Sequence, residues 1–426
     1  MSPELQEGIY YREKPPIGNS FCIISLRCDA GIEAREVGNI VNRIWERLSR
    51  LRKGIIADLE IDRRHRKTGN LSILLGYGAS IFDLIDSKKY RPLHFSEKWK
   101  FKRPIPNGGG TIIEGSNISY SEKVQDNHLL DDHVLFQFIA ETGFYTTRAV
   151  VEVWKEINEW KKNTGNSPLH ISGLYKGFQR ADQRNWQGFH DGVSNLKSQE
   201  RRFVISIESK YLNPRDKWTL HGTYLAFMRL SIDLKKWEEL SIKEQEILVG
   251  RDKLTGCPLV RVDSNGLPVK DARCPVPGTT EVTDRGNEHF RDFTRLGMFR
   301  ANSKLENSHI RRARPLERFP VWDIRSSRIY RQGFEFLDSS NEHPGFTAGL
   351  NFVSFQNTPE RLFRSLTYPR HIPNNANAPM PNFENFFSVL VAGIFLVPPV
   401  VPDEPFPGAR LFFNSNELKY LTKNAG

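Results

Sequence analysis

The chain has 426 residues, of which 38% are hydrophobic and 26% are charged. This composition is typical of a folded protein with one large or two medium domains, and it excludes an intrinsically disordered chain. The formal net charge of +11 favours anionic partners, such as nucleic acid, anionic lipid or acidic small molecules, without choosing among them.

The four cysteines, Cys22, Cys28, Cys257 and Cys274, are too few and too scattered for a disulfide scaffold. We therefore expect buried or free thiols in a reducing compartment. The first residues show no basic segment followed by an apolar one, so the expected location is cytoplasmic. The longest apolar run, 386–401, is interrupted by proline and is shorter than the roughly 20 residues that span a bilayer. It predicts a buried strand and no membrane partner.

The first half of the chain alternates between strand and helix patterns. An apolar run at 21–27 has strand composition, and apolar residues at three-and-four spacing then predict a helix over 37–48. Further strands are predicted over 70–76 and, after a loop rich in Pro and Gly, over 133–140. A second helix follows, and its inner face is expected to carry Val150, Val151, Trp154, Ile157 and Trp160.

The second half repeats this alternation. It shows strand patterns over 222–230, 349–356 and 389–397, and helix patterns over 234–249 and from Thr358-Pro359-Glu360. Residues 251–300 are rich in Gly, Pro and Asp with little periodicity, which indicates a functional insertion. Two α+β halves are therefore predicted, each with a sheet covered on one face by helices.

Two motifs carry the candidate chemistry. Residues 188–192 read Gly-Phe-His-Asp-Gly and are followed by Asn195, whereas residues 307–333 contain His309 and Arg331. An imidazole can ligate haem iron from one side of the ring, while an arginine on the other side can hold charge on a bound peroxide. Taken singly, each motif also fits a role without catalytic function. Asp-Gly is a common turn pair, and a histidine among basic residues is often solvated.

Together these motifs resemble the signature of the dye-decolorizing peroxidase family. Further motifs in the order of that family cover residues 5–9, 222–224, 250–259, 328–331 and 349–352. The resemblance implies an α+β fold of two ferredoxin-like domains, with antiparallel sheets and peripheral helices. Residues 1–200 would form the first domain, and residues 201–426 would form a second domain that binds one haem b.

The resemblance also implies the roles of the site residues. His309 would ligate the iron, Asp191 would be the distal acid and base, and Arg331 would stabilise negative charge. Arg311 or Arg312 would meet a haem propionate through a charge-assisted bond.

A carboxylate base predicts a pH optimum on the acid side, since an ordinary aspartate is ionised above about pH 4. His190 is the alternative base, although a structural role in the loop is favoured for it. The chain also departs from the family at 314–316, which read Arg-Pro-Leu, and at Asn357-Thr358, where the family often has an acid. If that acid normally contacts the iron ligand, its replacement would make the ligand less electron-donating.

The predicted function is a haem peroxidase that uses hydrogen peroxide to oxidise bulky aromatic substrates, such as dyes or phenols, through a high-valent iron-oxo intermediate. Because a bulky dye does not enter a narrow pocket, exposed aromatic residues are candidates for relaying the oxidation, namely Trp186, Trp218, Trp322 and Tyr330. One alternative is a haem-binding protein without peroxidase turnover that carries or processes haem. A basic nucleic-acid-binding protein is disfavoured, because Lys and Arg are spread without a recognisable binding motif. A homo-oligomer is compatible with the sequence.

Overall fold

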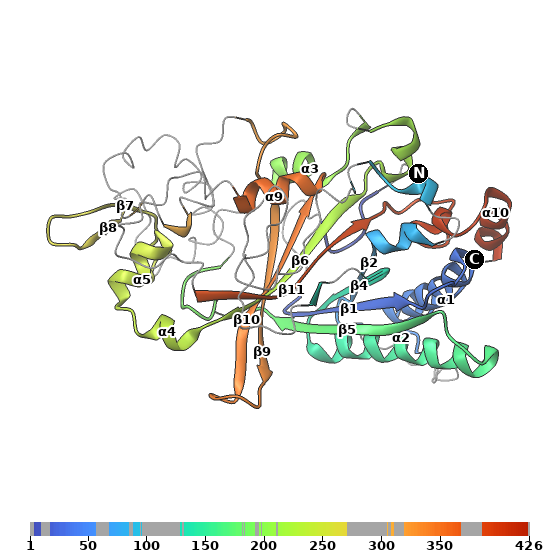
Figure 1. Cartoon of the computed structure of the whole chain (residues 1–426), viewed down its shortest axis with the longest axis horizontal. Coiled ribbons are helices and arrows are strands. Elements are labelled where there is room, and N and C mark those ends of the chain that lie inside the picture. The colour runs from blue at the N-terminus through green and yellow to red at the C-terminus, as the bar shows by residue number, and fades with distance from the viewer. Residues whose placement is uncertain are drawn as a thin grey trace.

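A computed structural model of the chain describes residues 4–9, 18–56, 68–84, 88–93, 95, 128–129, 132–180, 182, 184–191, 196, 198–209, 212–270, 305, 308–310, 319–367 and 386–424. Within these residues nine strands form one hydrogen-bonded sheet, and a separate hairpin consists of β7 (Leu259–Val262) and β8 (Pro268–Lys270). The strands run through the middle of the molecule with helices packed around them (Figure 1).

The N-terminal half contributes four antiparallel strands in the order β2-β4-β1-β5. Their bounds are β1 (Ser20–Cys28), β2 (Ser72–Gly78), β4 (Val134–Ala140) and β5 (Leu169–Phe178). Helices α1 (Ala34–Arg52) and α2 (Gly143–Thr164) pack side by side, and Figure 1 shows them along one face of these strands. This βαββαβ order is the ferredoxin-like arrangement.

The C-terminal half repeats the arrangement, with the strand order β9-β10-β6-β11. Its strands are β6 (Thr223–Ile232), β9 (Tyr330–Ser339), β10 (Phe346–Gln356) and β11 (Phe387–Val397). Helices α4 (Leu234–Glu238) and α5 (Ile242–Val249) follow β6, and α9 (Pro359–Thr367) connects β10 to β11 in sequence. The predicted α+β fold with two ferredoxin-like units is confirmed. The predicted domain boundary after residue 200 lies within α3 (Ser198–Ile205) and stays a prediction.

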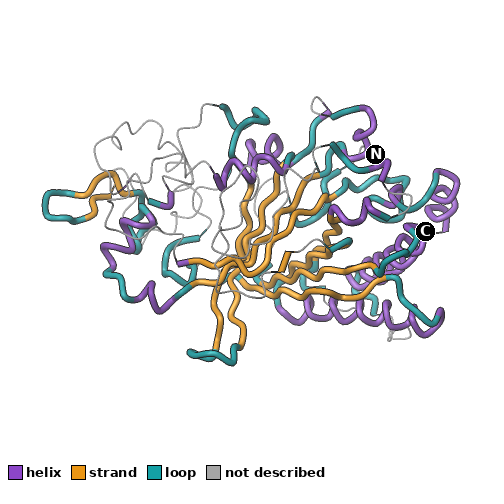
Figure 2. The backbone as a smooth tube through the Cα atoms, in the orientation of Figure 1, coloured by secondary structure: helices purple, strands orange, loops and turns teal. Residues whose placement is uncertain are grey.

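The two four-stranded sheets are joined at both edges. β5 meets β9 at the pair Phe178 and Glu335, and β11 meets β2 at two residue pairs, so eight of the strands form a closed ring. Figure 2 shows the strands in orange. Phe21 of β1 stacks on Phe334 of β9 with ring centroids 4.4 Å apart, which places part of the core between the two sheets. The remaining short elements are β3 (His128–Leu129), η2 (Ala79–Asp83), η3 (Lys88–Tyr90), η6 (Pro214–Thr219), η11 (Ala409–Leu411) and α10 (Ser415–Asn424).

The predicted inner face of α2 is partly wrong. Val150, Ile157 and Trp160 pack against the core, but Val151 and Trp154 are exposed. The residues that α2 buries instead include two acidic side chains, Glu152 and Glu156. The spacing of apolar residues in the sequence could not predict that this face of α2 is buried, because it contains charged residues. Their charges are neutralised by partners on another helix.

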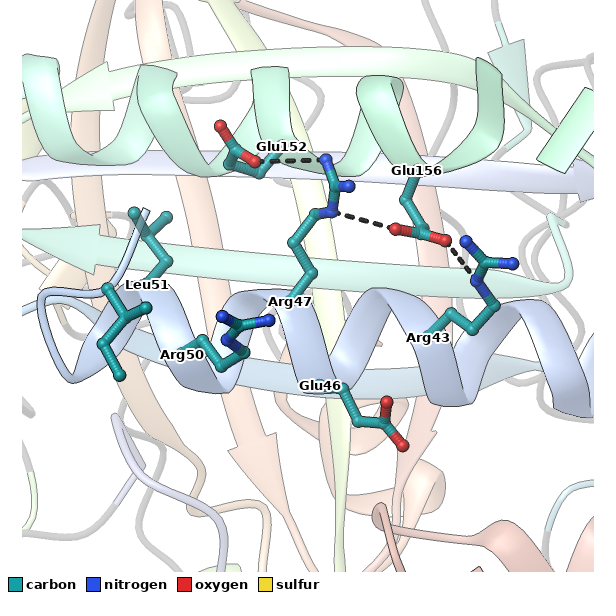
Figure 3. Close-up of a pocket in the computed structure, with 8 residues that line it drawn as sticks. Arg43, Glu46, Arg47, Arg50, Leu51, Glu152 and Glu156 are labelled. Atoms are coloured by element: carbon teal, nitrogen blue, oxygen red, sulfur yellow. Dashed lines mark hydrogen bonds and ion pairs between the residues drawn. The ribbon is translucent and has the colours of Figure 1, made fainter. Parts of the chain in front are cut away.

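Those partners are arginines of α1. Arg47 lies 2.8 Å from Glu156 and 3.3 Å from Glu152, and Arg43 lies 2.5 Å from Glu156. Figure 3 shows these side chains reaching across a small pocket between the two helices, with a volume of about 230 Å³. Four of the lining residues, Arg43, Arg47, Glu152 and Glu156, already pair with one another, and none of the predicted site residues lines the pocket. We therefore interpret it as part of the helix packing.

Two further expectations need correction. The helix predicted over 234–249 is two helices, because Ser241 caps α5 in a capping box with Glu244 and interrupts the run. Cys22 and Cys28 are buried free thiols as predicted, but Cys257 is disulfide-bonded, and its partner lies outside the described residues. A disulfide weakens the argument for a reducing compartment. None of the helices in the described part of the chain has the length and apolar character needed to cross a membrane.

Candidate functional site

One face of β9 carries the polar residues of the candidate site. Side chains alternate between the two faces of a strand, and Phe334 points into the core against Phe21. Arg331, Gly333 and Glu335 therefore share the opposite face. Arg331 is half-buried, while Glu335 is only 4% exposed.

The Gly-Phe-His-Asp-Gly loop places Asp191 directly over this face. A Cβ added at Gly333 would lie 3.0 Å from Asp191 Oδ2, so the absence of a side chain at residue 333 leaves the room that the carboxylate occupies. Burial lowers the pKa of Arg331, the negative charge of Asp191 opposes that shift, and the positive charge of Arg328 adds to it. The structure thus brings together Asp191 and Arg331, which the sequence separates by more than a hundred residues.

Arg184 fixes the backbone of this loop. Its guanidinium donates to the carbonyl oxygens of Gly188 at 2.6 Å, Lys253 at 2.7 Å and Leu254 at 2.8 Å. The same guanidinium lies 3.0 Å from His190 Nε2. Burial and the charge of Arg184 both lower the pKa of His190. These contacts tie His190 to the scaffold and fit the structural role expected for it, while Asp191 is exposed.

His309 is held at the C-terminal end of α5. It is half-buried, and its neighbours Ser308 and Ile310 pack against Gly250, which caps α5 with φ +87°. A Cβ at Gly250 would lie 2.7 Å from Ser308 Oγ and 2.6 Å from Ile310 Cγ1, so only glycine allows this approach. Arg311 and Arg312 lie outside the described residues, as does Asn195.

Arg251 is a site residue that the sequence analysis did not single out. It is 4% exposed, it donates to the carbonyl of Gly256 at 2.8 Å, and burial together with the charge of Arg331 lowers its pKa to about 9. Two guanidinium groups that repel one another in a partly buried site favour the binding of an anion. The family motif at 250–259 contains Arg251 and could have indicated it. The distance along the sequence between Arg251 and Arg331 gave no sign that the two lie close together.

The residues present fit a haem group. A ferric porphyrin with propionates needs an imidazole, basic groups and apolar walls, and the structure supplies His309, the pair of Arg251 and Arg331, and two apolar clusters. The apolar clusters lie on the elements that carry the site. Their buried members are Phe189, Trp237, Leu248, Val249 and Phe386 in one, and Ile247, Leu259 and Leu305 in the other.

The four candidate relay residues differ in exposure. Trp322 is 53% exposed and Trp186 is half-buried, but Tyr330 and Trp218 are buried, so the expectation that all four are exposed is wrong. Trp186 is linked to the site, because its backbone N–H donates to Glu335 Oε2 at 3.2 Å.

Asn357 and Thr358 stand where the family often has an acid. The Asn357 side chain donates to the carbonyl of Phe203 at 3.0 Å and accepts from Arg361 Nε at 2.7 Å. Thr358 is buried, and its Oγ1 accepts the backbone N–H of Glu360 at 3.4 Å. These bonds tie α9 to α3 and to its own first turn. Whether Thr358 replaces an acid beside the iron ligand stays a prediction.

Residues 182–402, more than half of the chain, match the family model described as Dyp-type peroxidase, C-terminal. The chain belongs to the Dyp-type peroxidase family. Members of this family are peroxidases that use hydrogen peroxide and bind haem b. The resemblance found in the sequence is therefore confirmed.

Individual relatives are more distant. A deferrochelatase from Escherichia coli (strain K12) is 26% identical over 342 residues, which is 78% of this chain and 66% of that relative. The DyP-type peroxidase from Cellulomonas bogoriensis matches with a TM-score of 0.65 at 17% identity, over 97% of this chain and 99% of that chain. Ferric DtpA from Streptomyces lividans gives a TM-score of 0.63 at 20% identity, over 96% and 98% of the two chains. At these identities the solved structures show a shared fold.

Proposed function

We propose that the protein is a haem peroxidase that reduces hydrogen peroxide and oxidises bulky aromatic substrates, such as dyes or phenols. The observation that carries the proposal is the meeting of Asp191 with Arg331 over Gly333. A carboxylate beside a guanidinium is the pair of groups that peroxide cleavage needs, because one moves a proton and the other holds negative charge.

The chain's own residues would act in a fixed order. His309 is the residue that would hold haem, and the bound haem would supply the redox chemistry that peroxide cleavage needs. Asp191 would accept a proton from one peroxide oxygen and return it to the other, which leaves as water. Arg331 would stabilise the negative charge that develops meanwhile, and Arg251, Arg311 and Arg312 are the candidates for holding the propionates.

Substitutions at the two distal residues test this function. In haem-reconstituted protein, Asp191→Asn and Arg331→Leu should each lower peroxide-dependent oxidation of a phenol or a dye by about 10²-fold or more. Asp403→Asn is a matched control, since this exposed aspartate follows β11 and lies outside the site. Equal rates in the Asp191→Asn variant and the wild type would contradict the proposal.

A second candidate function is the processing of haem without peroxidase turnover. It is favoured by the curated relatives, which are named deferrochelatase. The two functions are separated by following free iron with a chelator and dye oxidation in the same reaction. Iron release that persists in Asp191→Asn and Arg331→Leu, with no dye oxidation in the wild type, would favour the second function.

Location and assembly are further proposals. The disulfide at Cys257 argues against the expected cytoplasmic location. Cell fractionation tests the location, and light scattering tests whether the chain forms a homo-oligomer.

A further inference from the structure

Glu335 is a buried acid beside the site that the proposed reaction does not use. Its backbone pairs with Phe178 where β5 meets β9, and its side chain is 4% exposed. Oε2 accepts the backbone N–H of Trp186 at 3.2 Å, whereas Oε1 is buried without a hydrogen-bond partner in the described part of the chain. An ionised carboxylate with a bare buried oxygen is unfavourable, while a protonated carboxyl carries a donor of its own on that oxygen.

The charged groups around Glu335 come from three elements. Asp191 lies over the neighbouring Gly333, Arg331 is on the same face of β9, and Arg180 follows β5. Burial and then the negative charge of Asp191 raise the pKa of Glu335 to about 8, against the lowering effects of the Trp186 N–H and of Arg180. Arg180 also pairs with Asp182 at 2.7 Å, which reduces its effect on Glu335.

We propose that Glu335 is a positioning residue that holds one proton beside Asp191, so that this buried carboxyl adds no second negative charge to the site. The inference rests on the proposed function. Loss of that proton would add a second negative charge beside Asp191, which would oppose the negative charge that develops on the peroxide oxygen.

A pH profile separates this role from a purely structural one. Glu335→Gln keeps the shape and an oxygen acceptor for Trp186 but does not ionise. Peroxide-dependent activity of the wild type should fall about tenfold between pH 7 and pH 9, as expected one unit above a pKa of about 8. In Glu335→Gln this fall should be less than about twofold. Glu335→Asp, which keeps a carboxyl group that can ionise, should again show the fall in activity at alkaline pH. The control Glu342→Gln, at the exposed tip of the β9–β10 hairpin, should keep the profile of the wild type.

A second readout does not depend on turnover. In the full-length, haem-reconstituted protein without peroxide, infrared difference spectra between pH 6 and pH 9 should show loss of a protonated carboxyl band. That band should be missing in Glu335→Gln, and it should disappear at lower pH in Asp191→Asn, because the charge that raises the Glu335 pKa is gone.

The outcomes distinguish the two proposals. If the wild type shows no such band at pH 6, or if Glu335→Gln keeps the alkaline fall in activity, the role of Glu335 is overturned. If the band behaves as expected but the wild type oxidises no substrate with peroxide, the proposed function fails while the proton on Glu335 stands.

Discussion

Phe334 stacks on Phe21 with ring centroids 4.4 Å apart, and this contact decides which way the next residues of β9 face. Because Phe334 points into the core between the sheets, Gly333 and Glu335 on either side of it point toward the Asp191 loop. A core contact between the two ferredoxin-like units thus sets the orientation of the polar face. The candidate site depends on the packing of both halves.

Gly333 is the position where this dependence is most easily tested. A Cβ there would lie 3.0 Å from Asp191 Oδ2, so Gly333→Val should push the carboxylate away from Arg331 and lower peroxidase activity by about 10²-fold. Gly143→Ala is the control, because its Cβ would meet only Ser20 Oγ at 3.7 Å. Steady-state rates and circular dichroism of both variants check the prediction. A Gly333→Val variant that is folded and fully active would show that the close approach has no functional role.

Arg47 should matter for stability and not for chemistry. It bridges Glu152 and Glu156, which are almost fully buried, so Arg47→Met would leave two buried carboxylates with fewer partners. Loss of one partner from a buried ion pair costs about 3–5 kcal/mol. Arg35→Met removes a surface pair with Glu417 and should cost less than about 1 kcal/mol. Denaturant unfolding of the two variants measures the difference, and equal losses would contradict the account of the α1–α2 interface.

Glu335 should also leave a signature in the pH dependence of stability. Its pKa rises from an ordinary value of 4.5 to about 8 in the folded protein, so the folded state keeps a proton that the unfolded chain releases. The contribution of this group is therefore fully present below pH 4.5 and is lost as the pH rises through 8. Relative to Glu335→Gln, the wild type should lose about 4 kcal/mol between pH 5 and pH 9. Unfolding curves at several pH values measure this, and parallel curves for the two proteins would contradict it.

The sequence predicted those elements that carry a strong apolar pattern. β1 and β11 were predicted within a few residues because most of their side chains are buried, and α1 was predicted because its buried apolar residues recur at three-and-four spacing. β5 was missed because it alternates with exposed residues and contains Gly173 and Gly177. β9 was missed because the face of the strand that carries the candidate site has no apolar side chain. This face consists of Arg331, Gly333 and Glu335.

The candidate site was predicted by its motifs but not by its surroundings. Asp191, His309 and Arg331 came from the family resemblance, and the structure shows that the first and third of these meet. Glu335 and Arg251 were not predicted as site residues, because their burial and charge depend on where two sheets and a loop come together. Contacts between residues so far apart in the sequence cannot be predicted from the spacing of residues along it.

The most direct test that the protein binds haem through His309 and reacts with peroxide is a visible absorption spectrum. It is recorded on the haem-reconstituted protein before and after one equivalent of hydrogen peroxide. His309→Ala is the test variant, and His170→Ala, an exposed histidine on β5, is its control. We expect a ferric haem spectrum that changes on addition of peroxide in the wild type and in His170→Ala, and altered ligation or weak haem binding in His309→Ala. A wild-type protein that binds no haem, or a His309→Ala variant with the unchanged wild-type spectrum, would contradict this expectation.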